Sequence, residues 1–202
     1  MTVERPELSL LIPVYNAAET INALVERLSA ELDSLRIEFV LVNDGSSDDS
    51  DAVCRKLHEI YPNQLTYVKL ARNFGEHNAV MAGLAQTTGE YVVIMDDDFQ
   101  NPPEEVLKLH SAAREGSFDV VYSQYERKQH SPFRNLGSTL HNRMAVALIK
   151  KPRDLYLSSF KCLSRWLVKQ VVGYTGPFPY LDGLIFRCTH NYGTVEVRHD
   201  ER

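Results

Sequence analysis

The sequence predicts a three-layer α/β/α fold with a mostly parallel central sheet, and three observations lead to this prediction. Short apolar runs alternate with segments whose apolar residues recur at helical spacing, and the connections between them are short. The first apolar runs are continuous, which is typical of strands buried on both faces of a parallel sheet. Residues 1–202 suffice for one substantial core and contain no repeat or linker, so we expect a single domain.

The alternation of strands and helices is clearest before residue 126. Strands are expected over residues 8–14, 37–42, 65–70, 91–95 and 118–123. Helices are expected over about 16–32, 48–61, 76–86 and 102–114. Capping boxes mark two of these helix starts, because Asn16 precedes Glu19 by three residues and Asn101 precedes Glu104 in the same way.

The second part of the chain has a less regular pattern. The expected elements are a helix over about 133–150, a strand over 155–160, a short helix ending near Val172 and a strand over 194–198. The Gly/Pro-rich segment 173–183 lies before the last strand, and no helix or strand is predicted within it.

Charge is distributed unevenly along the chain, although the net charge is only −5. Residues 1–126 hold 9 Lys and Arg against 22 Asp and Glu, whereas residues 127–202 hold 13 against 5. The helix expected over 133–150 combines an apolar stripe with basic residues such as Arg134 and Lys150. Such a helix either contacts a membrane surface or packs on the sheet with a solvated basic face, and both interpretations stay open. No nucleic-acid partner is expected.

The three cysteines, Cys54, Cys162 and Cys188, are widely spaced and do not match a metal-binding pattern. We therefore expect reduced thiols and a cytosolic environment. No apolar run approaches the ~20 residues that a membrane-spanning helix requires, and the polar residues 1–7 do not resemble a signal peptide.

The fourth expected strand ends in three consecutive aspartates, Asp96, Asp97 and Asp98. In α/β sheets, ligands bind at the carboxyl ends of the parallel strands. Because side chains alternate along a strand, Asp96 and Asp98 can share one face while Asp97 points away. Two carboxylates on one face favour a hard cation such as Mg²⁺ or Mn²⁺, which also binds substrate phosphates. The alternative is an acidic turn that caps the next helix.

Two other loops at the same sheet edge carry candidate binding residues. Asp44 follows the second expected strand, where it either forms a plain turn or binds a nucleobase or ribose; its position beside the acidic cluster favours binding. Arg72 follows the third expected strand and is either a phosphate-binding residue or a surface arginine. The chain has no G-x-G-x-x-G after its first strand and no G-x-x-x-x-G-K-S/T, which argues against a dinucleotide site and a P-loop.

Four segments in combination resemble glycosyltransferase family 2 of the GT-A fold. They are LSLLIPVYNAAETI, FVLVNDGSSDDS, LARNFGEHNAVMAGLAQTTGEYVVIMDDDFQNPPEE and SSFK. Within this family the chain more closely resembles the polyprenyl-phosphate glycosyltransferases, which include dolichyl-phosphate mannose synthases and bacterial undecaprenyl-phosphate sugar transferases. The resemblance extends over essentially the whole chain and implies a GT-A α/β/α sandwich.

The resemblance implies that the first part of the chain, residues 1–126, binds the nucleotide sugar and the metal. Pro13 and Tyr15 would line a nucleotide pocket together with Asp44, which would bind the base or ribose. The family's metal-binding D-x-D-x-Q is matched by Asp96, Asp98 and Gln100. In this resemblance the second aspartate and the glutamine contact the cation that bridges the donor diphosphate.

The resemblance also implies that residues 127–202 bind the acceptor. Arg127, Arg134 and Ser138 match positions near the donor phosphates and the lipid-phosphate acceptor. The two arginines, together with Asp98, are therefore the candidate catalytic residues.

Two later segments match the family with differences. Residues 158–161 align with a family S-G-F-R segment, in which Ser159 replaces the glycine and Lys161 replaces the arginine, so a bidentate contact is not implied. Arg202 matches the first residue of the family's R-x-x-G-x-S-x-Y. Family members of this type continue into C-terminal transmembrane helices, so we expect this chain to be a truncated catalytic domain.

The resemblance thus implies a metal-dependent, inverting glycosyltransferase at the cytoplasmic face of the cell membrane. The expected donor is a nucleotide diphosphate sugar, with a UDP-sugar favoured, and the expected acceptor is undecaprenyl or dolichyl phosphate. A phosphate acceptor is already anionic, so catalysis needs positioning and charge stabilisation more than a strong general base. A homo-oligomer is compatible with this reading.

Three other functions would each require a different feature of the chain. A family 2 enzyme acting on a soluble or polysaccharide acceptor would need a general base, for which Asp182 is the candidate. A non-catalytic module would bind the nucleotide sugar without turnover. A nucleotidyltransferase would require a Gly-rich, basic loop after the first strand, and the sequence has none there.

Overall fold

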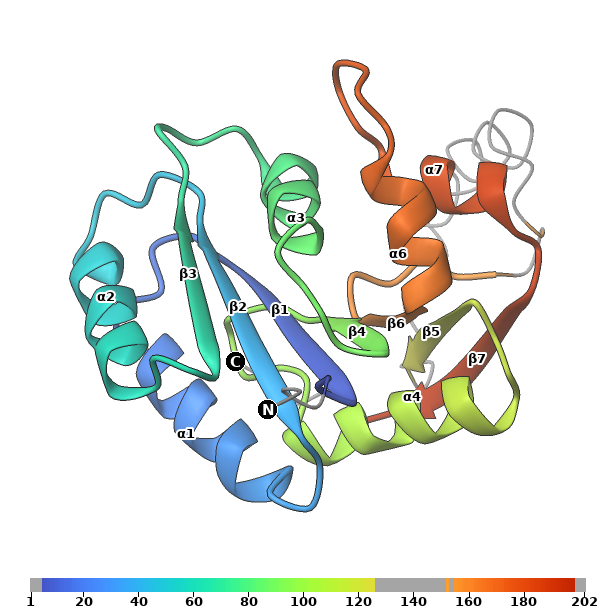
Figure 1. The fold of residues 1–202 in the computed structure, drawn as a ribbon, viewed down its shortest axis with the longest axis horizontal. Helices are drawn as coiled ribbons and strands as arrows, with labels where there is room; N and C mark the ends of the chain where they lie inside the picture. The colour runs from blue at the N-terminus through green and yellow to red at the C-terminus, as the bar shows by residue number, and fades with distance from the viewer. Residues whose placement is uncertain (1–4, 126–151, 153–154, 199–202) are drawn as a thin grey trace, which may run out of the picture.

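The computed structural model describes residues 5–125, 152 and 155–198, which form a sheet covered by helices on both faces (Figure 1). The sheet has seven strands in the order β3-β2-β1-β4-β6-β5-β7. They are β1 (Leu8–Val14), β2 (Ile37–Asn43), β3 (Leu65–Lys69), β4 (Tyr91–Ile94), β5 (Val120–Tyr125), β6 (Lys161–Ser164) and β7 (Tyr192–Val197). Only β6 is antiparallel to its neighbours, β4 and β5. This mostly parallel, three-layer arrangement confirms the predicted fold class.

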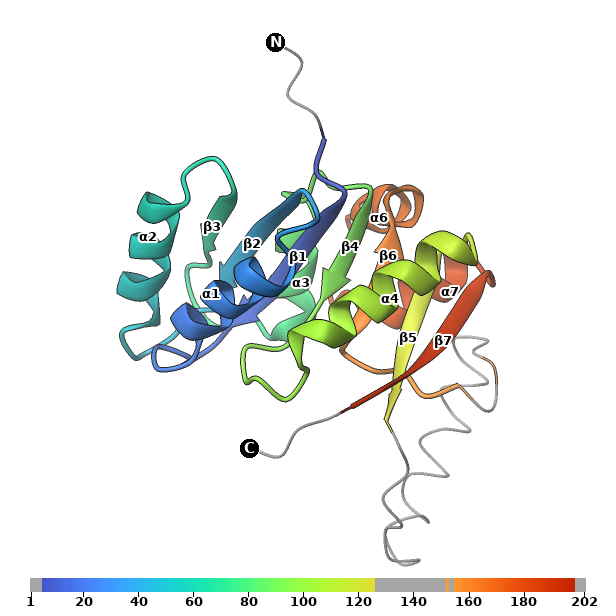
Figure 2. The ribbon, with the colours of Figure 1, turned by 90° about the horizontal axis from the view of Figure 1, so that it is seen from below.

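Two helical layers enclose the sheet (Figure 2). The helices are α1 (Ile21–Glu31), α2 (Ser50–Ile60), α3 (Glu76–Leu84), α4 (Pro103–Glu115), α6 (Arg165–Val172) and α7 (Leu181–Cys188). One core lies between the sheet and α1, α2 and α4, and the other lies between the sheet and α3, α6 and α7. Strand β1 contributes to both, since Leu10 and Ile12 belong to the first core and Leu11 to the second. Its apolar run is continuous because both of its faces are buried.

The strand predicted over residues 155–160 is wrong, because the strand in this region is β6, which begins at Lys161. The residues before β6 are held by side chains instead of by a strand ladder. Ser158 Oγ lies 2.6 Å from Ser123 Oγ and accepts a hydrogen bond from the Phe160 amide at 3.1 Å. Ladder pairing starts where Lys161 lies opposite Ile94 of β4. The hydroxyl-rich segment therefore leads into the sheet without joining it.

Helix α7 lies within and beyond the Gly/Pro-rich segment, where no element was predicted. Its buried residues Leu181, Leu184 and Ile185 have helical spacing, and Asp182 lies in its first turn, where an acid is favourable. This signal is present in the sequence, but Gly183 and the preceding prolines obscure it.

The two predicted capping boxes are also wrong. Helix α1 begins after Thr20, while Asn16 adopts a left-handed conformation with φ 55° and accepts a hydrogen bond from the Ser47 amide at 2.8 Å. Helix α4 begins after Pro102, and Asn101 Oδ1 accepts a hydrogen bond from Tyr125 at 3.1 Å. Both asparagines thus connect loops to distant parts of the chain.

The basic helix expected over 133–150 lies outside the described residues. Within the part of the chain that the structure describes, no helix combines the length and apolar character needed to cross a bilayer. The final predicted strand is confirmed as β7, although it begins two residues earlier, at Tyr192.

Candidate active site

The loops that follow β1, β2, β3 and β4 meet at the carboxyl edge of the sheet. They are joined by hydrogen bonds between residues far apart in sequence, such as the bond from the Asn16 amide to Ser46 Oγ at 3.0 Å. Similarly, the Tyr15 amide donates to Asp97 Oδ2 at 3.1 Å, which ties the loop after β1 to the loop after β4. The predicted pocket residues Pro13 and Tyr15 therefore lie beside the acidic cluster.

The acidic cluster follows β4, and each of its aspartates has a defined contact. Asp96 Oδ2 accepts a hydrogen bond from Ser159 Oγ at 2.8 Å, and Asp98 Oδ1 accepts one from the Gln100 amide at 3.2 Å. Asp97 was expected to point away from the other two, but it binds the loop after β1. Burial raises the pKa of Asp97 to about 6, and the neighbouring charges of Asp98 and Asp96 act in the same direction.

These residues fit a divalent cation by the chemistry of their donor set. Asp96, Asp98 and the side chain of Gln100 offer hard oxygen ligands, and the mutual repulsion of adjacent carboxylates would be relieved by a bound cation. In the described residues, no three His, Cys, Asp or Glu side chains gather as a complete metal-binding group. A cation here would thus need water or substrate phosphate to complete its coordination, as Mg²⁺ commonly does.

Asp44 organises the loop after β3. Its buried carboxylate accepts hydrogen bonds from the Phe74 amide at 2.7 Å and from the Gly75 amide at 2.8 Å. The loops after β2 and β3 also touch at Gly45, whose φ is +68° and whose added Cβ would lie 2.4 Å from the Arg72 carbonyl carbon. Only glycine fits this position, because both the backbone conformation and the space exclude a side chain. Binding of a base or ribose by Asp44 stays a prediction.

Arg72 lies at the exposed rim of this loop. Its guanidinium is stacked over the ring of Phe74, at 4.4 Å from the ring centroid. Such stacking restrains the side chain while its N–H donors stay available for an anion. The prediction that Arg72 contacts a donor phosphate remains open.

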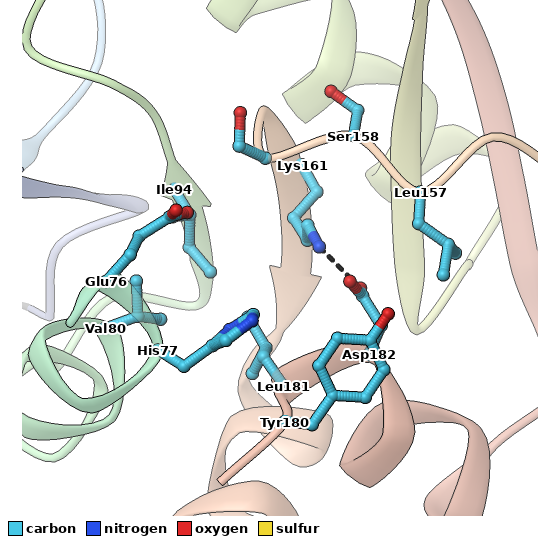
Figure 3. Close-up of a pocket in the computed structure, with 11 residues that line it drawn as sticks. Glu76, His77, Val80, Ile94, Leu157, Ser158, Lys161, Tyr180, Leu181 and Asp182 are labelled. Atoms are coloured by element: carbon cyan, nitrogen blue, oxygen red, sulfur yellow. Dashed lines mark hydrogen bonds and ion pairs between the residues drawn. The ribbon is translucent and has the colours of Figure 1, made fainter. Parts of the chain in front are cut away.

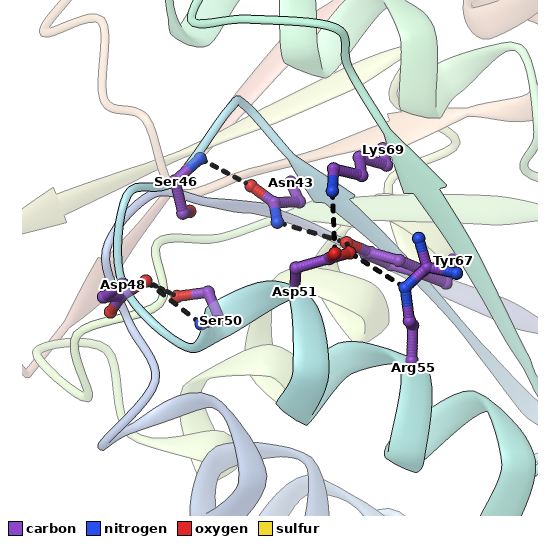
Figure 4. A network of polar contacts seen from close by, with 8 residues as sticks. All are labelled: Asn43, Ser46, Asp48, Ser50, Asp51, Arg55, Tyr67 and Lys69. Atoms are coloured by element: carbon purple, nitrogen blue, oxygen red, sulfur yellow. Dashed lines mark hydrogen bonds and ion pairs between the residues drawn. The ribbon is translucent and has the colours of Figure 1, made fainter.

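A polar network supports the loop after β2 from behind (Figure 4). Asn43 accepts a hydrogen bond from the Ser46 amide at 2.9 Å and donates to Tyr67 Oη at 3.1 Å. Asp51 then binds Lys69 Nζ at 2.7 Å and Tyr67 Oη at 2.6 Å. The hydrogen bond from Lys69, followed by that from Tyr67, lowers the pKa of Asp51 to about 2.

A cavity of about 250 Å³ lies beside the acidic cluster (Figure 3). It is bounded by the start of α3, the end of β4, residues 157–161 and the start of α7. Its lining includes side chains with polar or titratable groups, which are Glu76, His77, Ser159, Lys161, Tyr180 and Asp182. Ser159 both lines this cavity and donates to Asp96, so the acidic cluster lies next to the cavity wall. The rings of His77 and Tyr180 meet edge to face, with centroids 5.2 Å apart.

A buried ion pair forms one wall of the cavity. Lys161 and Asp182 are 3% and 6% exposed, and Lys161 Nζ lies 2.5 Å from Asp182 Oδ1. The same oxygen accepts a hydrogen bond from Tyr122 Oη at 2.9 Å, and the ammonium lies 4.9 Å from the Tyr122 ring centroid. Burial and the charge of Asp182 raise the pKa of Tyr122, so it remains a hydroxyl donor.

The structure brings together the predicted residues of the first part of the chain and two of the second. Ser159 and Lys161 reach the same edge because β6 is inserted next to β4. Arg127, Arg134, Ser138 and Arg202 lie outside the described residues. Sequence reasoning did not select Glu76 or Tyr180 and interpreted His77 as a helix-start or packing residue, yet all three line the cavity. The signal for Glu76 and His77 was their place directly after Gly75, at the start of a helix on the binding edge.

Comparison with known proteins identifies the family. Residues 9–172 match glycosyl transferase family 2. The chain belongs to this family. An undecaprenyl-phosphate 4-deoxy-4-formamido-L-arabinose transferase of Sodalis glossinidius is 38% identical over 168 residues, which cover 82% of this chain and 50% of that protein. The protein of the same name from Aeromonas hydrophila is 36% identical over 166 residues, which cover 81% and 49%. The chain thus spans about half the length of these relatives.

Solved structures share the fold. Glucosyl-3-phosphoglycerate synthase of Mycobacterium tuberculosis, solved with Mn²⁺, UDP and glucosyl-3-phosphoglycerate, has a TM-score of 0.68 at 20% identity, covering 98% of this chain and 73% of its own. A mannosyltransferase of Pyrobaculum calidifontis, solved with GDP-Man and Mn²⁺, has a TM-score of 0.67 at 21% identity, covering 97% and 56%. These similarities confirm the GT-A fold, and the family match confirms the resemblance drawn from the motifs.

Proposed function

We propose that this chain is the catalytic part of a metal-dependent, inverting glycosyltransferase. It transfers a sugar from a nucleotide diphosphate sugar, favoured to be a UDP-sugar, to a polyprenyl phosphate. The observation that carries the proposal is the 2.8 Å hydrogen bond between Ser159 and Asp96, which joins a cavity large enough for a reacting group to the acidic cluster at the nucleotide edge. The relatives that are named for undecaprenyl phosphate support this choice of acceptor.

The donor binds across the loops after β1, β2 and β3 in this proposal. Pro13 and Tyr15 line the nucleotide, Asp44 binds the base or ribose, and Arg72 contacts a phosphate. Asp44 would serve a ligand through the lone pairs that its two amide hydrogen bonds leave available. Mg²⁺ or Mn²⁺, held by Asp96, Asp98 and Gln100, would neutralise the charge of the leaving diphosphate.

The acceptor phosphate approaches through the cavity. An oxygen of this phosphate attacks the anomeric carbon, the bond from that carbon to the donor phosphate breaks, and the configuration inverts. Arg127, Arg134 and Ser138 are proposed to orient the donor and acceptor phosphates, and Lys161 and Arg202 to complete the acceptor side. The phosphate is already ionised at neutral pH, so positioning and charge stabilisation supply the catalysis.

A second candidate function is transfer to a neutral hydroxyl of a soluble or polysaccharide acceptor. Asp182 favours it, because this carboxylate lines the cavity and would be placed to accept a proton. Lys161 and Tyr122 both donate to Asp182 Oδ1, however, so two side chains of the protein already occupy the oxygen that would accept the proton. We therefore favour the phosphate acceptor.

The relatives' acceptor also suggests where the protein acts. We propose the cytoplasmic face of the cell membrane, with the bilayer surface as a partner and a homo-oligomer as a compatible state. This placement supplies a cytosolic nucleotide sugar and a membrane-borne phosphate to one site.

Release of UDP tests the proposal. A nucleotide sugar is first selected by thermal shift in the presence of Mn²⁺, and its turnover is then measured with undecaprenyl phosphate or with undecaprenol. We expect UDP release that depends on the phosphate. Equal release with the alcohol would favour the hydroxyl-acceptor function, and binding of the nucleotide sugar without turnover would indicate a non-catalytic module.

A further inference from the structure

The loop between α6 and α7 projects from the carboxyl edge of the sheet, beside the cavity (Figure 1). We call residues 173–180 the aromatic loop, because its sequence GYTGPFPY holds three aromatic residues and no charge. Phe178 belongs to this loop and is 91% exposed, more than any other large apolar side chain in the described part of the chain. A phenylalanine with so little burial against the described residues is available to another surface.

The aromatic loop is built to hold Phe178 outward. Tyr174 Oη donates a hydrogen bond to the Pro177 carbonyl at 3.0 Å, and a Cβ added to Gly176 would lie 2.4 Å from Tyr174 Oη. Phe178 has φ 52°, an unfavourable conformation for a bulky side chain, and Pro179 follows it directly. The contacts of Tyr174 and the fixed φ angles of the prolines restrict the backbone on both sides of Phe178. The loop would therefore lose little conformational entropy when the Phe178 ring binds another surface.

The aromatic loop is continuous with the reaction site. Its last residue, Tyr180, lines the cavity and contacts His77. A further exposed ring, Phe74, lies on the loop after β3 at the same sheet edge. This edge therefore carries more than one exposed aromatic ring around the approach to the site.

We propose that the aromatic loop docks on a lipid bilayer, with Phe178 entering the boundary between head groups and acyl chains. The inference rests on the proposed lipid-phosphate acceptor, because a protein that takes its acceptor from a membrane must bring its cavity to the bilayer surface. Aromatic side chains favour this boundary, and an uncharged loop can enter it without desolvating an ion.

Trp166 provides an internal control. It is 49% exposed and is the only tryptophan of the chain, but it lies at the opposite edge of the sheet. Its neighbour Arg165 donates hydrogen bonds to the Gly89 and Thr87 carbonyls, in the loop that precedes β4. An exposed aromatic residue at this edge would stay in water when the aromatic loop docks.

Fluorescence tests the orientation directly. The original chain carries its indole at the control position, and the variant Trp166→Phe/Phe178→Trp carries it on the aromatic loop. Both are mixed with vesicles of phosphatidylcholine and phosphatidylglycerol, with and without brominated acyl chains. We expect a blue shift and bromine quenching for the variant only. The proposal is overturned if the variant shows neither, whether or not the chain sediments with the vesicles.

Vesicle affinity supplies a second readout. Phe178→Ser should reduce the partition coefficient of the chain onto vesicles by about tenfold. This factor corresponds to losing roughly half of the transfer free energy of a fully buried phenylalanine side chain. Trp166→Ser should leave partitioning unchanged. The loss should persist at high salt, since apolar contact is not screened whereas attraction of basic residues to anionic lipid is. Equal effects of the two substitutions would overturn the proposal.

Activity separates this inference from the proposed function. Phe178→Ser should lower transfer to undecaprenyl phosphate in vesicles and leave transfer to a short, water-soluble prenyl phosphate unchanged. Equal losses with both acceptors would overturn the docking role. If neither acceptor receives sugar from the original chain, the proposed function fails, and the fluorescence result decides whether the aromatic loop docks on a bilayer.

Discussion

Replacing Lys161 alone should destabilise the fold strongly. Lys161 and Asp182 are 3% and 6% exposed, so water screens their ion pair very little. The substitution Lys161→Met leaves the carboxylate buried, with the Tyr122 hydroxyl as its remaining described side-chain donor. Removing one partner of a buried ion pair costs about 3–5 kcal/mol. For a chain of this size the loss corresponds to a decrease in Tm of roughly 6–20 °C.

A matched variant separates the charge from the packing. Lys161→Met/Asp182→Leu/Tyr122→Phe removes both charges and the hydroxyl together, so none of the three positions keeps an unpaired polar group. We expect its stability to return to within about 1–2 kcal/mol of the original chain, because buried ion pairs can be replaced by apolar residues of similar volume at little cost.

The assay is unfolding in urea followed by far-UV circular dichroism, with Tm measured in parallel. We predict a large decrease in the free energy of unfolding for the single variant and a small decrease for the triple variant. A single variant as stable as the original chain would show that the pair is not effectively buried. A triple variant as unstable as the single one would show that volume, rather than an uncompensated charge, dominates at this site.

Three further predictions concern the nucleotide edge. Asp98→Ala should lower the calorimetric affinity for UDP in Mn²⁺ to the value measured without metal; an unchanged affinity would contradict the metal assignment. Gly45→Ala should lower the free energy of unfolding in urea by about 2–4 kcal/mol, because the added Cβ clashes with the backbone and the residue is strained at φ +68°. Gly75→Ala should lower it by about 1–2 kcal/mol, because φ is +89° but no atom lies within 4 Å of the added Cβ. Equal losses for the two variants would exclude the clash at Gly45. The pKa of Asp51 is about 2 in the fold and 3.8 ordinarily, so its ion contributes stability above about pH 4 that is lost as the pH falls towards 2. Asp51→Asn should reduce this acid dependence of Tm; an unchanged curve would contradict the assigned contacts with Lys69 and Tyr67.

The parts of the fold that sequence patterns predict are those that depend on local burial. Strands β1, β2 and β4 are short apolar runs because both of their faces are covered, and this property is visible without knowledge of their neighbours. Strand β6 has only four residues and includes Lys161, whose partner Asp182 is 21 residues away. Its sequence does not predict a buried strand, because the burial of Lys161 depends on contacts with distant parts of the chain.

The candidate site also combines residues that can be found from local sequence with contacts that depend on the assembled fold. The acidic residues after β4 can be found from the sequence because they directly follow an apolar run and match the family motif. The contact of Ser159 with Asp96 spans 63 residues and arises only because β6 is inserted between β4 and β5. The role of Asp97 in holding the Tyr15 amide likewise depends on the approach of two loops 82 residues apart in sequence. Spacing within one segment cannot reveal such contacts.

The identity of the product tests the central claim most directly. The chain is incubated with Mn²⁺, undecaprenyl phosphate and a radiolabelled nucleotide sugar chosen by thermal shift, and the products are separated between chloroform and water. We predict an acid-labile, chloroform-soluble lipid in which the sugar is joined to phosphate with inverted anomeric configuration, as determined by NMR. Label that stays in the water phase, or a sugar phosphate lipid with retained configuration, would contradict the account.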